Sequence, residues 1–399
     1  MGLLGAALAA ASGAHGCSVY DPSLLEPLPS PVEPKSGVGW WSGNDFRGCF
    51  SAGAPRPEDR PAPQGDDDVG PIYLAVESMR LGSLNEQGVL DGNAWQDLGF
   101  DLDGICTASE TCESADPPPS CRAGASAISR DGRFCRDNTF GRLEHTAAGV
   151  PEITRKYGLS DDAFNCALCV GHYNFLIRIT GYNGRPNDDR VRVDLYPSPG
   201  LEQPLPWDCS QPDWKTRPCF QPDMPWTVLE DGLAERRPGP DLPDAKLFDE
   251  AAYVRDGYIV AQLPADTLFW FPGYNALVVA YPLRLAQGIV AGKLERGADG
   301  VWRVRDGTIA GRSRGTDIVD AFRLMGFCES DSNYKLMTTF VEANLDISSS
   351  GSKDPEVLCD AMSVGIGFTA LQALAGKLAT VEPLEECVLK SKSALDGGQ

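Results

Sequence analysis

The segment 174–196 alternates apolar and polar residues on both sides of a turn-forming stretch at 183–189. Apolar residues stand at every second position in 175–179 and again in 191–195. Successive side chains of a β-strand point to opposite faces, so a period of two predicts strands. We therefore expect an antiparallel hairpin with one buried face. Because two strands alone are unstable in water, the hairpin requires a larger sheet around it.

Short apolar segments separated by hairpin-type turns supply the rest of that sheet. Asp-Gly pairs at 256–257, 299–300 and 306–307 punctuate the second half of the chain. Many short strands with few helices favour a mainly β fold, an antiparallel β-sandwich or jelly roll over residues 71–313. Further strands are predicted at 72–81, 258–263, 267–271, 277–285, 289–295, 301–305 and 308–310, and a helix at 138–157.

The chain changes character at Thr316, and a small disulfide-tied helical subdomain is predicted for residues 314–399. Thr316 can cap a helix over 317–325, and Ser332 can cap a second helix. The uncharged apolar run 361–376 is too short to span a bilayer and is predicted to be a buried helix. At least one of the three cysteines here must pair with the β domain or stay free; they are Cys328, Cys359 and Cys387.

Thirteen cysteines in a chain of 399 residues indicate disulfides formed outside the reducing cytosol. Cys166 and Cys169 have a CxxC spacing, but no second pair or histidine follows at zinc-finger distance. The pair precedes a hairpin rather than a βαβ unit, which disfavours a thioredoxin-like site. We predict that these two cysteines are bridged separately. Cys209 and Cys219 are close enough in sequence to be tied as one small loop.

Residues 1–17 resemble a bacterial lipoprotein signal peptide, in which a short apolar run and small residues precede Cys17. Cleavage there would make Cys17 the lipidated first residue, and Ser18 resembles the signal for delivery to the outer membrane. The alternative is an ordinary secretory signal cut near Gly16. Residues 18–70 are rich in proline and glycine and are predicted to be a tether, with an aromatic patch at 40–49 that docks on the main domain. The expected location is the outer membrane or cell surface.

The formal net charge of −21 argues against nucleic acid as a partner, because phosphates would repel such a surface. An acidic surface can attract cations, and Asp101-Leu-Asp103-Gly is the best candidate for a Ca²⁺ site. Asp137 and Asn138 follow Cys135 and would add ligands if a disulfide folds that loop back. The alternative is an acidic turn whose carboxylates cap backbone amides.

Three tryptophans, Trp207, Trp214 and Trp226, surround the segment between Cys209 and Cys219. Rigid aromatic side chains on a tied loop can stack on a sugar ring or on a partner surface, so they are candidate ligand contacts. The alternative is that these tryptophans fold inward as a small core.

Catalytic signatures are sparse. After the predicted signal peptide only His145 and His172 remain, neither lies in an HExxH motif, and we expect no nucleophile-elbow serine to accompany them. We therefore expect a non-enzymatic envelope protein that binds a glycan or an envelope protein, or that has a structural role. The alternative is a secreted carbohydrate-active hydrolase, with a carboxylate pair on a jelly-roll scaffold.

Five segments of the chain carry a resemblance to known proteins: 17–25 (CSVYDPSLL), 99–104 (GFDLDG), 181–189 (GYNGRPNDD), 306–312 (DGTIAGR) and 359–370 (CDAMSVGIGFTA). Together they resemble a group of uncharacterised, cysteine-rich lipoproteins of myxobacteria. The resemblance spans most of the chain. It implies a location in the cell envelope and carries no activity or catalytic residues.

Overall fold

The chain separates into two units, Met1–Lys35 and Ser36–Gln399. A computed structural model describes parts of the second unit, so the predicted signal peptide and Cys17 lie outside the described residues. The described residues are 39–44, 49–65, 67–107, 119–124, 130–148, 161–209, 213–235, 242–271, 281–324, 328–330 and 332–381.

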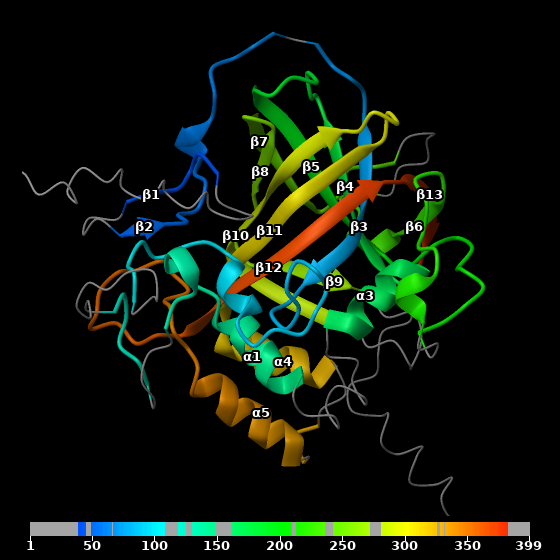
Figure 1. The fold of residues 1–399 in the computed structure, drawn as a ribbon. Coiled ribbons are helices and arrows are strands. Elements are labelled where there is room, and N and C mark those ends of the chain that lie inside the picture. Colours follow the sequence, from blue (N-terminus) through cyan, green and yellow to red (C-terminus); the bar gives the residue numbers. More distant parts are fainter. Residues whose placement is uncertain are drawn as a thin grey trace, which may run out of the picture. The chain divides into compact units, whose positions relative to one another are not determined.

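Eight antiparallel strands form a closed β-barrel (Figure 1). The sheet closes because β11 pairs with β12 on one side and with β10 on the other. The mainly β, antiparallel prediction is confirmed, but the architecture is a barrel where a sandwich or jelly roll was expected. In barrel order the strands are β11 (Trp302–Arg314), β12 (Ala361–Gln372), β3 (Ile72–Arg80), β4 (Asn174–Thr180), β5 (Asp188–Ser198), β7 (Leu247–Arg255), β8 (Tyr258–Gln262) and β10 (Tyr281–Arg296). A ninth strand, β9 (Thr267–Phe271), pairs with the first part of β10.

The predicted hairpin is confirmed as β4 and β5, with Ile177 opposite Leu195. The prediction of a single buried face is wrong. Leu176, on the face opposite Ile177, belongs to a second apolar cluster that contains Trp226. The neighbouring Arg178 donates to the carbonyl of Leu242 at 2.8 Å and is buried as well.

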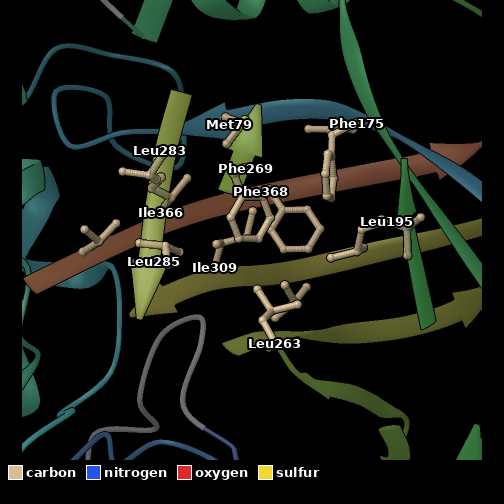
Figure 2. Close-up of a cluster of buried hydrophobic side chains, with 14 of the residues drawn as sticks. Met79, Phe175, Leu195, Leu263, Phe269, Leu283, Leu285, Ile309, Ile366 and Phe368 are labelled. Carbon is tan, nitrogen blue, oxygen red and sulfur yellow. The ribbon is translucent and has the colours of Figure 1, made fainter. Parts of the chain in front are cut away.

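The barrel interior is filled by apolar side chains from every strand, so it is a packed core. Phe175, Phe269 and Phe368 meet at its centre, and Phe175 and Phe269 have ring centroids 5.1 Å apart (Figure 2). Side chains from four helices join this cluster. They are α1 (Thr139–Ala148), α3 (Asp161–Val170), α4 (Gly315–Leu324) and α5 (Ser332–Glu342). Among the described residues, no helix has both the length and the apolar character needed to cross a bilayer.

Two smaller apolar clusters cover the outer face of the barrel. One packs Trp226 of β6 (Pro225–Leu229), which pairs with β13 (Leu374–Ala379), against β3, β4 and β5. The other packs Trp40 and Trp41 against strands β7, β8, β10 and β11. The 40–49 patch therefore docks as predicted, and this part of the expected tether belongs to the folded unit. Short elements in the covering segments are β1 (Gly43–Asn44), β2 (Phe50–Ser51), and the 3₁₀ turns Pro57–Asp59, Ala94–Asp97, Arg133–Cys135, Trp214–Thr216 and Glu230–Gly232.

The helix predicted at 361–376 is wrong, because this segment forms β12 and the start of β13. A strand buried on both faces reads as a continuous apolar run, which periodicity alone does not distinguish from a buried helix. The helices predicted after Thr316 and Ser332 are present as α4 and α5. They lie between β11 and β12 in the chain, so among the described residues the C-terminal region completes the barrel and is no separate helical subdomain.

Four disulfides join described residues. Cys166 pairs with Cys209 and Cys169 with Cys219, so the CxxC cysteines are bridged separately as predicted, whereas the small Cys209–Cys219 loop is wrong. Cys359 pairs with Cys121 across 238 residues, which ties the C-terminal region to the rest of the fold as expected. The fourth bridge joins Cys106 and Cys135, and Cys49 and Cys328 are disulfide-bonded as well.

We predict that Gly365→Ala destabilises the protein. A Cβ at Gly365 of β12 would lie 2.6 Å from the Cα of Gly99, so the 98–101 segment would have to move off the strand. Overpacking of this kind costs about 1–3 kcal/mol, measurable by urea denaturation. Gly124→Ala is the matched control, because nothing lies within 4 Å of its added methyl group. Equal unfolding midpoints for the two variants would contradict this account of the contact.

Candidate functional site

Three buried carboxylates meet beside the barrel. Asp101, Asp103 and Asp137 each offer an oxygen atom, and these oxygens all lie within 4.8 Å of one another. The three residues are only 5%, 6% and 4% exposed. The sequence predicts this grouping, and the structure brings the three together. We call them the carboxylate triad.

Backbone hydrogen bonds fold the 101–104 loop around Asp137. The amide of Leu102 donates to Oδ2 of Asp137 at 2.7 Å, and the amide of Asp103 donates to the same oxygen at 3.2 Å. The amide of Gly104 donates to Oδ1 of Asp101 at 2.6 Å, in a turn where Gly104 has a φ of 72°. Asp101 and Asp137 therefore do cap backbone amides, which was the alternative to metal binding. These bonds still leave carboxylate lone pairs available, since each oxygen can accept more than one bond.

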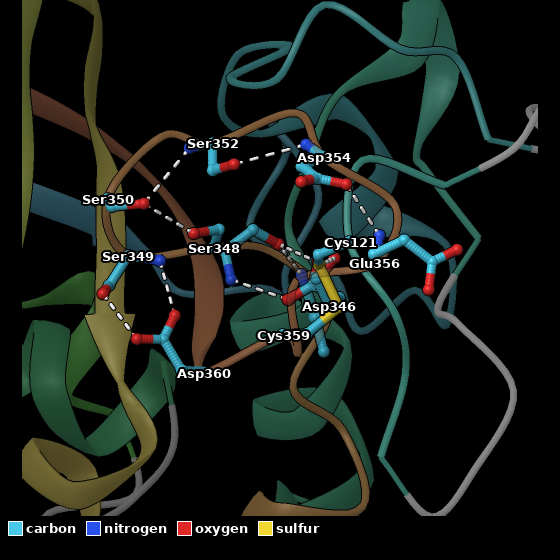
Figure 3. The surroundings of a disulfide bond; sticks show 12 residues. Cys121, Asp346, Ser348, Ser349, Ser350, Ser352, Asp354, Glu356, Cys359 and Asp360 are labelled. Carbon is cyan, nitrogen blue, oxygen red and sulfur yellow. Dashed lines mark hydrogen bonds between the residues drawn. A yellow bond between two sulfur atoms is a disulfide. The ribbon is translucent and has the colours of Figure 1, made fainter.

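Two disulfides position the triad. The Cys106–Cys135 bridge lies three residues after Asp103 and two residues before Asp137, so it folds the second loop back onto the first as anticipated. The Cys121–Cys359 bridge joins the neighbouring segment to the turns at 346–360 (Figure 3). Ser120, directly before that bridge, is 1% exposed and its hydroxyl makes no close hydrogen bond. This hydroxyl is near enough to Asp103 to lower the pKa of that carboxyl, which places a fourth oxygen beside the triad.

Asn138 does not belong to this group, which corrects the sequence prediction. Its Oδ1 accepts from the amide of Gly141 at 3.0 Å and from the amide of Gly365 at 2.9 Å. Its Nδ2 donates to the carbonyl of Trp95 at 3.1 Å. The Asn138 side chain therefore caps the first turn of α1 and joins this turn to β12. Its oxygen already accepts two hydrogen bonds.

Burial shifts the titration of the triad. Loss of solvent raises the pKa of Asp101 to about 6, and repulsion from Asp103 adds to this effect while the hydrogen bond from Ser51 opposes it. Burial also raises the pKa of Asp103, and raises that of Asp137 well above its usual value with the help of the neighbouring carboxylates. Three negative charges crowded out of water favour either protonation or a bound cation.

Arg312 of β11 connects the triad to the barrel wall. Its guanidinium donates to the carbonyl of Leu102, between the two loop aspartates, at 2.7 Å. It also donates to Oε1 of Gln287 on β10. Arg312 is only 5% exposed, so this contact fixes the 101–104 loop against the outer face of the barrel.

An open cleft of about 650 Å³ adjoins the triad. One wall is the N-terminal covering segment with Trp41, and another is the 101–104 loop. The barrel contributes residues of β8, β10 and β11. The polar residues that line the cleft include Ser51, Arg56, Asp101, Gln262, Gln287, Arg312 and Lys353. The cleft is not predictable from the sequence, because its walls come from segments that are far apart in the chain.

The three candidate tryptophans separate in the structure. Trp226 is fully buried and packs edge-on against Phe220 at 4.9 Å, so its indole is not available to a ligand. For Trp226 the alternative is therefore correct, because its side chain folds inward as part of a small core. Trp207 and Trp214 are half-buried, with Arg217 and Lys215 over their respective rings. Ligand contact at these two remains a prediction.

A nucleophile-elbow spacing does occur at 311–315 (Gly-Arg-Ser-Arg-Gly), contrary to the sequence expectation. The structure gives it no catalytic geometry. Ser313 lies in β11 opposite Met362 and is only 1% exposed, whereas an elbow serine is exposed on a sharp turn between a strand and a helix. We therefore assign no nucleophile here.

Two further buried carboxyl groups, Glu144 of α1 and Asp161 of α3, lie close to each other. Burial raises the pKa of Glu144 to about 8, with a further contribution from Asp161. Asp161 accepts hydrogen bonds from the amides of Ser83 and Leu84 at 3.0 and 2.8 Å. Glu144 accepts from the hydroxyl of Ser83 at 3.4 Å. Neither carboxyl lines the cleft, so we interpret the pair as structural.

The chain matches no protein-family model, and neither a curated protein nor a solved structure is similar to it. Function is therefore inferred from the described residues, above all from the triad and the adjoining cleft.

We predict that Glu144→Gln stabilises the protein at neutral pH. The folded pKa of about 8 exceeds the usual 4.5, so the stability contributed by protonated Glu144 is complete below pH 4.5 and is lost as the pH rises towards 8. A glutamine avoids that loss, and the variant should gain roughly 3 kcal/mol over the wild type by pH 7. Urea unfolding at several pH values measures this difference. The exposed Glu342→Gln on α5 is the control, and parallel pH profiles for wild type and Glu144→Gln would contradict the prediction.

Proposed function

We propose that this protein is an exported, non-enzymatic binding protein of the cell envelope, in which a calcium ion held by the carboxylate triad maintains the adjoining cleft. The observation that carries the proposal is the burial of three carboxylates with oxygens within 4.8 Å of one another. Such a group is costly without a compensating charge.

The ligand chemistry favours calcium among the common metals. The available donors are carboxylate oxygens and the Ser120 hydroxyl, and hard oxygen donors suit calcium or magnesium rather than zinc. Calcium holds its ligands at about 2.3–2.6 Å, so opposite ligands can lie about 5 Å apart. Magnesium requires shorter metal–oxygen distances of about 2.0–2.1 Å and a strict octahedron. The triad oxygens would have to move closer together to bind magnesium than to bind calcium. Asp101, Asp103 and Asp137 would hold the ion, which would supply positive charge and fix the 101–104 loop.

Binding is favoured over hydrolysis by the composition of the cleft. A glycosidase needs two carboxyl groups that flank the scissile bond, about 5–9 Å apart. Among the described residues that line the cleft, Asp101 is the one carboxylate. The proposed role of Asp101 as a calcium ligand would also remove it from acid–base chemistry.

The envelope location is proposed from the sequence and is supported by the disulfides. Four bridges between described residues suit a protein that folds outside the reducing cytosol. We propose that acylated Cys17 anchors the chain in the outer membrane, with the segment after it as a tether.

Calcium should raise the melting temperature of the protein, and chelator should reverse the rise. At a hundredfold excess over Kd a ligand adds about 2.7 kcal/mol of stability, which corresponds to several degrees. Asp103→Asn should abolish the calcium-dependent rise without lowering the melting temperature in chelator, because it relieves like-charge repulsion. Asp223→Asn, on the exposed surface, should keep the full rise. A melting curve of the wild type that calcium does not move would remove the ion from the proposal.

Intact mass spectrometry of the protein extracted from the envelope tests the anchor. We expect an N-terminus at Cys17 that carries acyl chains, and we expect Cys17→Ser to appear in the soluble fraction. An unmodified N-terminus, or one at another residue, would contradict lipidation.

A further inference from the structure

The cleft is locally cationic in a strongly acidic protein. The chain has a formal net charge of −21, yet the described residues that line the cleft include three cations, Arg56, Arg312 and Lys353, and one carboxylate, Asp101. Arg56 faces Glu58 at 3.8 Å in an exposed pair, an arrangement that contributes little. Asp103 and Asp137 lie directly behind this lining, so its positive charge prevails when a bound cation neutralises the triad.

Lys353 is the cation that lies beside the 101–104 loop. Its side chain is exposed, and its Nζ lies 2.9 Å from the position that a Cβ on Gly104 would take. The ammonium group therefore lies against the 101–104 loop, close to Asp101 and Asp103. A glycine at position 104 leaves the room that the ammonium occupies.

A strained residue shapes the opposite wall. The pairing of β10 with β11 is interrupted between Ala286 and Ile289, and Gln287 within this bulge has a φ of 51°. A non-glycine residue in this region is strained, and bulges are frequent next to binding sites, where they redirect a side chain. Here the bulge places Gln287 where its Oε1 accepts from Arg312 and its Nε2 donates to the carbonyl of Ser350 at 3.2 Å.

The remaining lining suits a hydroxyl-rich ligand. Gln262 donates its amide nitrogen to the carbonyl of Pro55 at 3.0 Å, which leaves the amide oxygen as an acceptor for a hydroxyl. Trp41 provides an aromatic surface of the kind on which the apolar face of a sugar ring packs. The volume of about 650 Å³ falls within the range of small-ligand sites, about 300–1,000 Å³.

We propose that the cleft binds an acidic sugar, with the sugar carboxylate between Lys353 and Arg312 and its hydroxyls towards Gln262 and Gln287. This inference rests on the proposed function, because a calcium ion on Asp101 offsets the carboxylate that would otherwise repel the ligand. Cationic side chains form the strongest hydrogen bonds to carboxylates, so the acid group provides most of the selectivity.

Calorimetric titration of the calcium-loaded full chain tests the proposal, with digalacturonate and its dimethyl ester as probes. The ester lacks both carboxylate charges and carries two added methyl groups, and the sugar rings and their hydroxyls are the same. We expect the ester to bind at least tenfold more weakly, and we expect Lys353→Gln to weaken binding of the acid about tenfold. Lys335→Gln, on the exposed face of α5, is the matched control and should bind like the wild type. Removal of the lysine charge should leave calcium affinity unchanged or increase it, so a loss of sugar binding cannot be attributed to loss of the ion.

Several outcomes would overturn the inference. These are equal binding of acid and ester, an equal loss in Lys335→Gln and Lys353→Gln, or tighter binding of inorganic phosphate than of digalacturonate. A chain that binds calcium in the same calorimeter but not digalacturonate would retire the acidic-sugar inference alone. A chain that binds no calcium would retire the proposed function itself.

Discussion

The pairing of β11 with both β10 and β12 is the constraint on which the rest of the structure depends. It closes the sheet, so the apolar interior is shielded and the long central strands have no open edge. Closure also brings β12 against Gly99, at the start of the loop that carries Asp101. The outer face of the same strands then supports Arg312, which holds that loop in place. The candidate site is thus built on the wall of the closed barrel.

Burial and charge oppose each other at this wall. The apolar covering cluster with Trp41 and Phe100 excludes water, and this exclusion raises the pKa of the neighbouring Asp101. Disulfides hold the crowded carboxylates together, because the Cys106–Cys135 bridge prevents the two loops from separating to relieve their repulsion. The disulfide and the burial therefore keep the three like-charged carboxylates close together, an arrangement that a bound cation stabilises.

Sequence periodicity predicted the elements with one dominant local pattern. The β4–β5 hairpin and the α4 and α5 helices follow from alternation and from caps, and the proximity of Asp137 to Asp101 followed from the position of Cys135. β12 was misassigned because a strand covered on both faces loses its alternation. Asn138 was misassigned because an amide next to carboxylates resembles a ligand until its backbone partners on Gly141 and Gly365 are known. The cleft and the disulfide partners depend on long-range contacts, which local sequence does not encode.

The two bridges of α3 have a consequence of their own. Cys166 and Cys169 lie about one turn apart on the helix, and they bind Cys209 and Cys219, so the chain is attached to α3 at two points. Trp214 and Lys215 add contacts to Asp162 of the same helix. A force applied to the chain at Cys209 or Cys219 is therefore shared between two covalent attachments on one helix.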